Sequence, residues 1–320
     1  MVNFILRSLR IPAGLVLLAL AVLAFGSDAF GDINNLDSLQ TIVGPMLILV
    51  VGMTLLFVVG NFDLSIGAVM GLSGIVAAIA MNAGLGVVTA CALAMGCGLL
   101  VGALNGLLVA VLGINPLIAT LAMLAIVRGV IEWLVRGLGV AGFTSMPADF
   151  VALGNAKLGG LYAVVWVGLL LVVAADWGLA RWPRLRQLYL IGGNTASARL
   201  LGLPVRSATF GVFVLTGGLA ALAGLMATAR VGMANRYLGV GAEMEVIIAC
   251  LIGGAVLAGG RGSVLCAALG ALFMALLKNG FNLVEVAPQW QGVALGAILS
   301  LVVVLDGLTA LRRRRQGLAA

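Results

Sequence analysis

The chain of 320 residues is 63% hydrophobic and carries charge on only 9% of its positions. Soluble domains have about 25% charged residues, so this composition excludes a soluble globular protein and predicts an all-α integral membrane protein. The net charge of +7 would suggest nucleic-acid binding in a soluble chain. Here the basic residues flank apolar segments, which indicates a role in membrane topology instead.

About ten apolar segments are long enough to cross a bilayer, which takes roughly 20 residues each. They are residues 11–27, 41–60, 64–82, 86–112, 116–135, 160–179, 208–229, 243–258, 264–281 and 290–310. The first segment resembles a signal peptide, but residues 24–27 match a cleavage site poorly, so we interpret it as an uncleaved helix. We therefore expect a polytopic helical bundle in which residues 1–320 form a single transmembrane domain.

The basic residues set the expected orientation, because cytoplasmic loops are enriched in Lys and Arg. With ten spans, twelve arginines fall on one side: Arg7, Arg10, Arg181, Arg184, Arg186, Arg199, Arg206, Arg261, Arg312, Arg313, Arg314 and Arg315. The loops of the opposite side carry mostly acidic residues. The sequence therefore predicts an even number of spans with both termini in the cytoplasm.

A polar cluster interrupts the apolar stretch between the second and third spans, in the run Gly60-Asn61-Phe62-Asp63-Leu64-Ser65-Ile66-Gly67. Asp63 and Ser65 are suited to the start of the following helix. One interpretation is a tight cytoplasmic turn. The other is a broken helix beside the translocation path, since free backbone groups at membrane depth are tolerated only in protein or at a water-filled cavity. On the second interpretation Asn61, Asp63 and Ser65 line the path.

Two further polar positions lie near the fourth and fifth spans. Asn115 and Pro116 are ordinary helix-start residues, and this simple interpretation is the favoured one. Asn105, Asn115 and Thr120 are nevertheless candidates to line the path, because they offer hydrogen bonds inside an apolar bundle. Overlapping GxxxG patterns at Gly98, Gly102 and Gly106 predict close helix packing.

The longest polar connection, about residues 181–207, follows the sixth span. Asn194 or Thr195 can cap a short helix that Gly202 and Pro204 end. Such an amphipathic helix is either held at the membrane surface by lipid headgroups or is a docking element for a cytoplasmic partner.

The sequence contains few clusters of residues suited to catalysis or metal binding. The sequence contains no histidine and no GxxxxGK[ST] motif, so we expect no metal site, no enzymatic activity and no ATP bound in the P-loop mode. Arg128 and Glu132 lie four residues apart, and a mutually satisfied pair is favoured over a contact with solute. Asp176, Glu243, Glu245 and Asp306 lie near span ends.

Four motifs in order resemble the ribose-type (carbohydrate) membrane permease family of ATP-binding-cassette importers, over roughly residues 40–308. They are Gly60 to Gly67, Pro116 to Met123, Leu190 to Leu203, and Leu251 to Ser263 with its paired glycines. The sequence departs from the family pattern at Asn61-Phe62 and at Asn115. Because both lie in possible path-lining regions, they leave the particular solute open, with a sugar, a nucleoside and a sugar-like signal molecule among the possibilities.

The resemblance implies a permease subunit in the bacterial inner membrane that forms the path for a sugar or similar small polar solute. It implies a second permease chain, identical or related, two cytoplasmic ATPase subunits that bind the ATP, and an extracytoplasmic solute-binding protein. The coupling residues on the ATPase would be Gly192, Gly193, Asn194, Arg199 and Gly202. A bulky residue at Gly193 is expected to uncouple ATP hydrolysis from transport.

The alternative is a secondary transporter driven by an ion gradient. Such proteins place ionisable residues near the middle of the membrane, whereas the acidic residues here gather near span ends. A membrane-embedded enzyme is disfavoured because the sequence shows no nucleophile and base pair.

Overall fold

The computed structural model describes residues 12–20, 23, 28–137, 142–143 and 146–315, with side chains omitted at 28–29, 142, 302 and 305–315. Its helices are η1 Asp28–Gly31, α2 Ile33–Val58, α3 Ile66–Asn82, α4 Val87–Gly106 continued by the π-turn η2 Leu107–Val111, α5 Pro116–Gly137, α6 Ala148–Asn155, α7 Ala163–Arg181, α8 Pro183–Gly193, α9 Thr195–Leu200, α10 Val205–Val231, α11 Ala242–Ile252, α12 Val264–Leu283 and α13 Pro288–Arg315. Two short antiparallel pairs join β1 Gly142–Phe143 to β4 Ala234–Asn235, and β2 Lys157–Leu158 to β3 Leu161–Tyr162.

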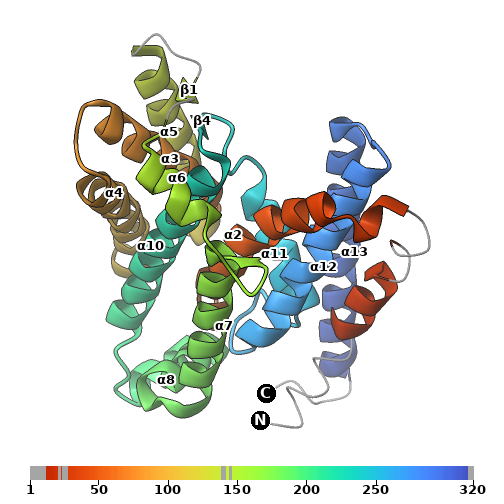
Figure 1. Ribbon diagram of the computed structural model, residues 1–320. Helices are drawn as coiled ribbons and strands as arrows, with labels where there is room; N and C mark the ends of the chain where they lie inside the picture. The colour runs from red at the N-terminus through yellow and green to blue at the C-terminus, as the bar shows by residue number, and fades with distance from the viewer. Residues whose placement is uncertain (1–11, 21–22, 24–27, 138–141, 144–145, 316–320) are drawn as a thin grey trace.

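The helices form a bundle around α2. Helices α4 and α10 lie on one side of α2, and α12 and α13 lie on the other (Figure 1). Helices α8 and α9 lie at the lower end of Figure 1, and β1 and β4 lie at the opposite end. Helix α2 is buried from Val43 to Val58, because every side of it is covered by another helix.

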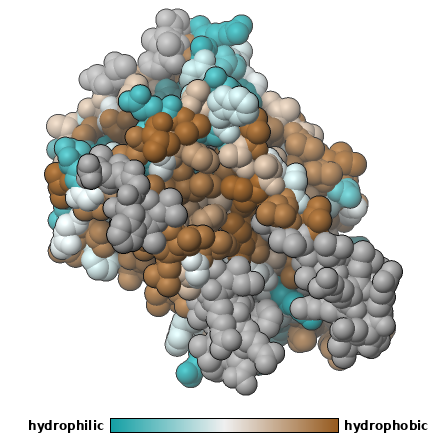
Figure 2. Space-filling view, turned by 90° about the vertical axis from the view of Figure 1, so that its right-hand side faces the viewer, coloured by the Kyte–Doolittle hydropathy of each residue, from teal (hydrophilic) through white to brown (hydrophobic). Residues whose placement is uncertain are grey.

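Apolar surface covers the middle of the molecule. Figure 2 shows hydrophobic residues across the centre of the visible face, with hydrophilic residues gathered toward its upper edge. Large apolar side chains such as Leu100, Ile126 and Val173 are exposed. A soluble protein rarely exposes so much contiguous apolar surface, so the surface fits an all-α protein surrounded by lipid.

Within the described residues, six helices are long and apolar enough to cross a membrane: α2, α4 with η2, α5, α7, α10 and α12. The expected crossing at 243–258 is not confirmed, because α11 ends at Ile252 and its 11 residues span about 16 Å. Helix α3, with 17 residues, is also short. The first segment is helical where it is described, at 12–20, while Arg7 and Arg10 lie outside the described residues. The count of ten crossings is therefore not confirmed.

Glycines bring α4 and α10 together. A Cβ atom built on Gly98 would lie 2.6 Å from the carbonyl oxygen of Gly217, and one on Gly102 would lie 2.5 Å from that of Phe213. The GxxxG patterns therefore serve packing within the chain, as the sequence predicts.

Gly217→Ala is expected to destabilise this crossing by about 1–3 kcal/mol, because the new methyl group would lie 2.8 Å from the Cα atom of Gly102. The measurement is the melting temperature of the purified protein in detergent. Gly211→Ala is the matched control on the same helix, since nothing lies within 4 Å of its Cβ position. Equal melting temperatures for the two variants would contradict this account of the packing.

Candidate functional site

The polar motif between α2 and α3 folds into a buried cluster. The Oδ1 atom of Asp63 accepts hydrogen bonds from the backbone N–H of Ser65 at 2.7 Å and from its hydroxyl at 2.6 Å. From α4, the Nδ2 atom of Asn105 donates to Asp63 Oδ2 at 3.0 Å and to Ser65 Oγ at 2.9 Å. All three side chains are at most 1% exposed. The cluster fixes the start of α3 against α4, and Asn105 Oδ1 is left without a partner in the described residues.

The other candidates for the path lie outside this cluster. Asn61 donates to the carbonyl oxygen of Val59, two residues earlier. Asn115 is exposed and accepts from the backbone N–H of Leu117, as a helix-start residue does. Thr120 is buried and donates to the carbonyl oxygen of Pro116 within its own helix. The structure thus brings together Asp63, Ser65 and Asn105 but not Asn61, Asn115 and Thr120.

The polar connection after α7 contains two helices, α8 and α9. Asn194 separates them and caps α9, because its Oδ1 atom accepts from the N–H of Ser197 at 2.9 Å. Gly202 ends the segment with φ +73°, a conformation that favours glycine. Arg199 is exposed, and Leu200 is 90% exposed. The exposed side chains of Arg199 and Leu200 leave this part of α9 open to a partner.

Three glycine-containing backbone segments meet where α8 ends, and we call this contact the glycine junction (Val58–Gly60, Gly192–Gly193 and Gly259–Gly260). The N–H of Gly260 donates to the carbonyl oxygen of Val58 at 2.9 Å. A Cβ atom on Gly192 would overlap that same oxygen and lie 2.8 Å from Gly260 N, whereas one on Gly193 would meet nothing nearer than 4.0 Å. The polar segment therefore rests directly on the end of the central helix.

A cavity of about 570 Å³ adjoins the junction, between α7, α8 and the loop before α12. On its walls, Tyr189 donates to the carbonyl oxygen of Gly262 at 2.7 Å, and Ser263 donates to Asp176 at 3.0 Å. Burial raises the pKa of Tyr189 to about 12, so its hydroxyl stays protonated and continues to donate. These bonds hold the loop before α12 against α7 and α8.

The charges of α5 are arranged differently from the sequence-based interpretation. Arg128 forms no ion pair with Glu132. It donates instead to the carbonyl oxygens of Arg236 and Leu238 at 3.3 and 3.1 Å. Glu132 pairs with Arg236 at 3.4 Å and with Arg136 at 3.6 Å. Arg136 lies four residues from Glu132 on α5 itself, but the loop after β4 carries a partner of each residue, and sequence spacing cannot indicate such a distant contact.

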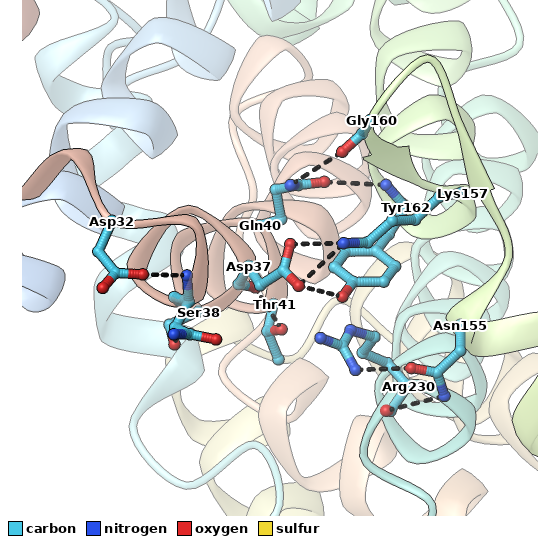
Figure 3. A network of polar contacts seen from close by, with 11 residues as sticks. Asp32, Asp37, Ser38, Gln40, Thr41, Asn155, Lys157, Gly160, Tyr162 and Arg230 are labelled. Atoms are coloured by element: carbon cyan, nitrogen blue, oxygen red, sulfur yellow. Dashed lines mark hydrogen bonds and ion pairs between the residues drawn. The ribbon is translucent and has the colours of Figure 1, made fainter.

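A polar network links the start of α2 to residues of the β2–β3 hairpin and of the end of α10 (Figure 3). Asp37 at the start of α2 accepts from Lys157 at 2.8 Å and from the hydroxyl of Tyr162 at 2.7 Å. The guanidinium of Arg230 lies 3.8 Å from the centre of the Tyr162 ring. The hydrogen bond to Asp37 is the main cause that raises the pKa of Lys157 above its usual value. This network joins α2, the β2–β3 hairpin and the end of α10.

Comparison with known proteins gives one family. The family model described as "Branched-chain amino acid transport system / permease component" matches residues 35–303. The ribose import permease protein RbsC of Escherichia coli (strain K12) is 34% identical over 293 residues, which cover 91% of each chain. The autoinducer 2 import system permease protein LsrC of Escherichia coli (strain K12 / DH10B) is 32% identical over 308 residues, covering 96% of this chain and 89% of the relative. LsrC of Shigella flexneri matches to the same extent. No solved structure matches the chain significantly.

Proposed function

This chain belongs to the family of permease components that includes these two importers, and from that premise we propose how it works and what it carries. It is a permease subunit of an ATP-binding-cassette importer and a multi-pass protein of the bacterial inner membrane. It is the membrane component of a transporter, not an enzyme. The sequence-based assignment to the carbohydrate importers is thereby confirmed.

The partners are proposed from the family. Two cytoplasmic ATPase subunits would bind the ATP, a second permease chain would complete the path, and an extracytoplasmic binding protein would deliver the solute. RbsC is named for ribose and LsrC for autoinducer 2, so the proposed solute is a sugar or a sugar-like molecule. Both termini are enriched in arginine, so the positive-inside rule places them in the cytoplasm, and this location is part of the proposal.

The glycine junction is the observation that carries the proposed mechanism. An ATPase seated on α8 and α9, with contacts to Asn194, Arg199 and Gly202, would push on a segment that touches the backbone of Val58 and Gly260. Backbone contacts have no flexible side chain to absorb the movement, so displacement of α8 would be passed to α2 and to the loop before α12. Nucleotide shifts the inward-open and outward-open populations only through its different affinity for the two states.

The solute path is proposed along the start of α3. Movement of α4 away from α3 would expose Asp63, Ser65 and Asn105 to the path. The other candidates would line the path only in other conformational states: Asn61, Asn115 and Thr120. In the arrangement described here the three clustered side chains are buried, so on this proposal it would be a closed form of the path.

A pulldown tests the assembly. The tagged chain, extracted in mild detergent, is expected to bring down an ATPase carrying a P-loop, as identified by mass spectrometry. A second permease sequence among the hits would indicate a heterodimer, and its absence a homodimer. Recovery of the chain with no ATPase under conditions that preserve its helical fold would contradict the proposed assembly.

A further inference from the structure

Helix α3 presents one face of glycines to polar side chains from three other helices. Gly67, Gly71 and Gly74 are spaced by four and three residues, so they share a face of the helix. Opposite them lie Glu243 of α11, Arg128 of α5 and Thr228 of α10, in that order along α3, and the carbonyl oxygens of Gly239 and Leu238 lie beside the first two. We call these three glycines with their three polar neighbours the α3 lane.

The polar groups of the lane lie directly against the glycine backbone. A Cβ atom on Gly67 would overlap the Oε2 atom of Glu243, and one on Gly74 would overlap the Oγ1 atom of Thr228. A Cβ atom on Gly71 would lie 3.2 Å from the Nη1 atom of Arg128. The lane is therefore closed in this arrangement.

Unpartnered polar atoms gather in the lane. Within the described residues, five buried side-chain nitrogen or oxygen atoms have no hydrogen-bond partner. Three of them belong to the lane: Arg128 Nη2, Glu243 Oε2 and Thr228 Oγ1. A fourth, Asn105 Oδ1, belongs to the side chain that binds Ser65, two residues before Gly67.

Packing alone does not explain this arrangement. A row of small residues lets helices approach closely. Such packing does not require polar side chains on the neighbouring helices. Each unpartnered buried donor or acceptor costs about 1–3 kcal/mol. Thr228 is only 1% exposed, so water does not reach its hydroxyl. Arg128 and Glu243 attract each other electrostatically but form no ion pair within 4.0 Å. Ionisable residues within membrane-spanning helices typically mark a substrate pathway, and Arg128 lies within α5, which is long and apolar enough to cross a membrane.

We propose that the α3 lane binds the hydroxyl groups of a polyhydroxylated solute when α3 separates from α5, α10 and α11. Glu243 accepts hydrogen bonds, Arg128 donates them and Thr228 does both, which matches hydroxyls that are themselves donors and acceptors. The three side-chain atoms left unpartnered in the closed form are thus paired by the solute in the open form. This inference rests on the proposed function and names the part of the path that the solute touches.

Thiol accessibility tests the lane without knowledge of the solute. Thr228→Cys is made in a chain whose four native cysteines are replaced by alanine, and the complex is reconstituted with its ATPase. Labelling by a small polar methanethiosulfonate is then followed in the resting state and after trapping with ATP and vanadate. The matched control is Thr216→Cys on the same helix, because Thr216 is equally buried but donates to Val212 and Gly52.

Thr228→Cys is expected to react at least about tenfold faster in one nucleotide state than in the other, while Thr216→Cys stays unreactive in both. A Thr228→Cys chain that transports solute with ATP but is never labelled would overturn the lane. Failure of the ATPase to join the complex would instead contradict the proposed function.

Valine substitutions provide the second measurement, in case the cysteine-free chain does not fold. Thr228→Val is expected to keep its melting temperature, since the hydroxyl it loses is unpartnered, and to lower the uptake rate about three- to tenfold. Thr216→Val is expected to lower the melting temperature, because its hydroxyl is hydrogen-bonded, and to leave the uptake rate unchanged. Unchanged uptake by Thr228→Val would contradict the inference.

Discussion

Alanine at position 192 is expected to uncouple ATP hydrolysis from transport. The added methyl group would overlap the carbonyl oxygen of Val58 and crowd the N–H of Gly260, which now donates to that oxygen. Both neighbours are backbone, so α8 must move away from α2. Overpacking of this kind costs about 1–3 kcal/mol, enough to change the balance of two states roughly five- to hundredfold. Uptake and ATP hydrolysis are measured together in proteoliposomes, and hydrolysis is expected to persist while uptake falls.

Gly193→Ala is the matched control for Gly192→Ala. The resemblance names both glycines as coupling residues, but a Cβ atom on Gly193 would meet nothing nearer than 4.0 Å. Gly193→Ala should therefore transport normally, and uncoupling by a bulky residue at Gly193 stays a separate prediction. Full coupling in Gly192→Ala, with the chain inserted and bound to its ATPase, would mean that the glycine junction does not transmit movement.

Removing the carboxylate of Asp63 is expected to destabilise the protein by on the order of 3 kcal/mol. Asp63→Ala leaves the N–H and hydroxyl of Ser65 and one donor of Asn105 without their acceptor, all in a site closed to water. The start of α3 would lose its connection to α4. The measurement is the melting temperature in detergent, together with the yield of inserted protein.

Asp63→Asn distinguishes the effect of lost hydrogen bonds from the effect of a smaller side chain. Its amide oxygen can still accept from Ser65, and a flip of the Asn105 amide would offer the now unpartnered Oδ1 atom to the new NH2 group. We expect this variant to lose only about 1 kcal/mol, because a single hydrogen bond to Ser65 is sacrificed. If Asp63→Ala were as stable as Asp63→Asn, the cluster would not be what holds α3 to α4.

Much of the helical framework could be predicted from hydropathy. The boundaries of α4 with η2, α5 and α12 fall within a few residues of the expected spans, because each is a long apolar run between turn residues. The cap at Asn194 and the end at Gly202 were also predictable from local chemistry. Helix α11 was not, because the apolar residues after Ile252 continue as a glycine-rich loop, which a hydropathy average does not distinguish from helix.

The site was predictable only in part. Asp63, Ser65 and Asn105 stood out as polar residues among apolar ones, but spacing could not show that they bind one another across 40 residues or more. Gly192 was named only through the family resemblance, and Thr228 carried no local signal at all. Their importance depends on what lies opposite them, Val58 in one case and Gly74 in the other, and only the tertiary structure supplies that.

On the proposed function, this chain forms the path of an importer driven by ATP. The most direct test is reconstitution of the chain with its ATPase in liposomes, followed by uptake of radiolabelled ribose and of autoinducer 2 presented with the binding protein. We predict that uptake requires ATP at the ATPase and is unaffected when ion gradients are collapsed. Uptake driven by an ion gradient in the absence of ATP and of the ATPase would contradict the account.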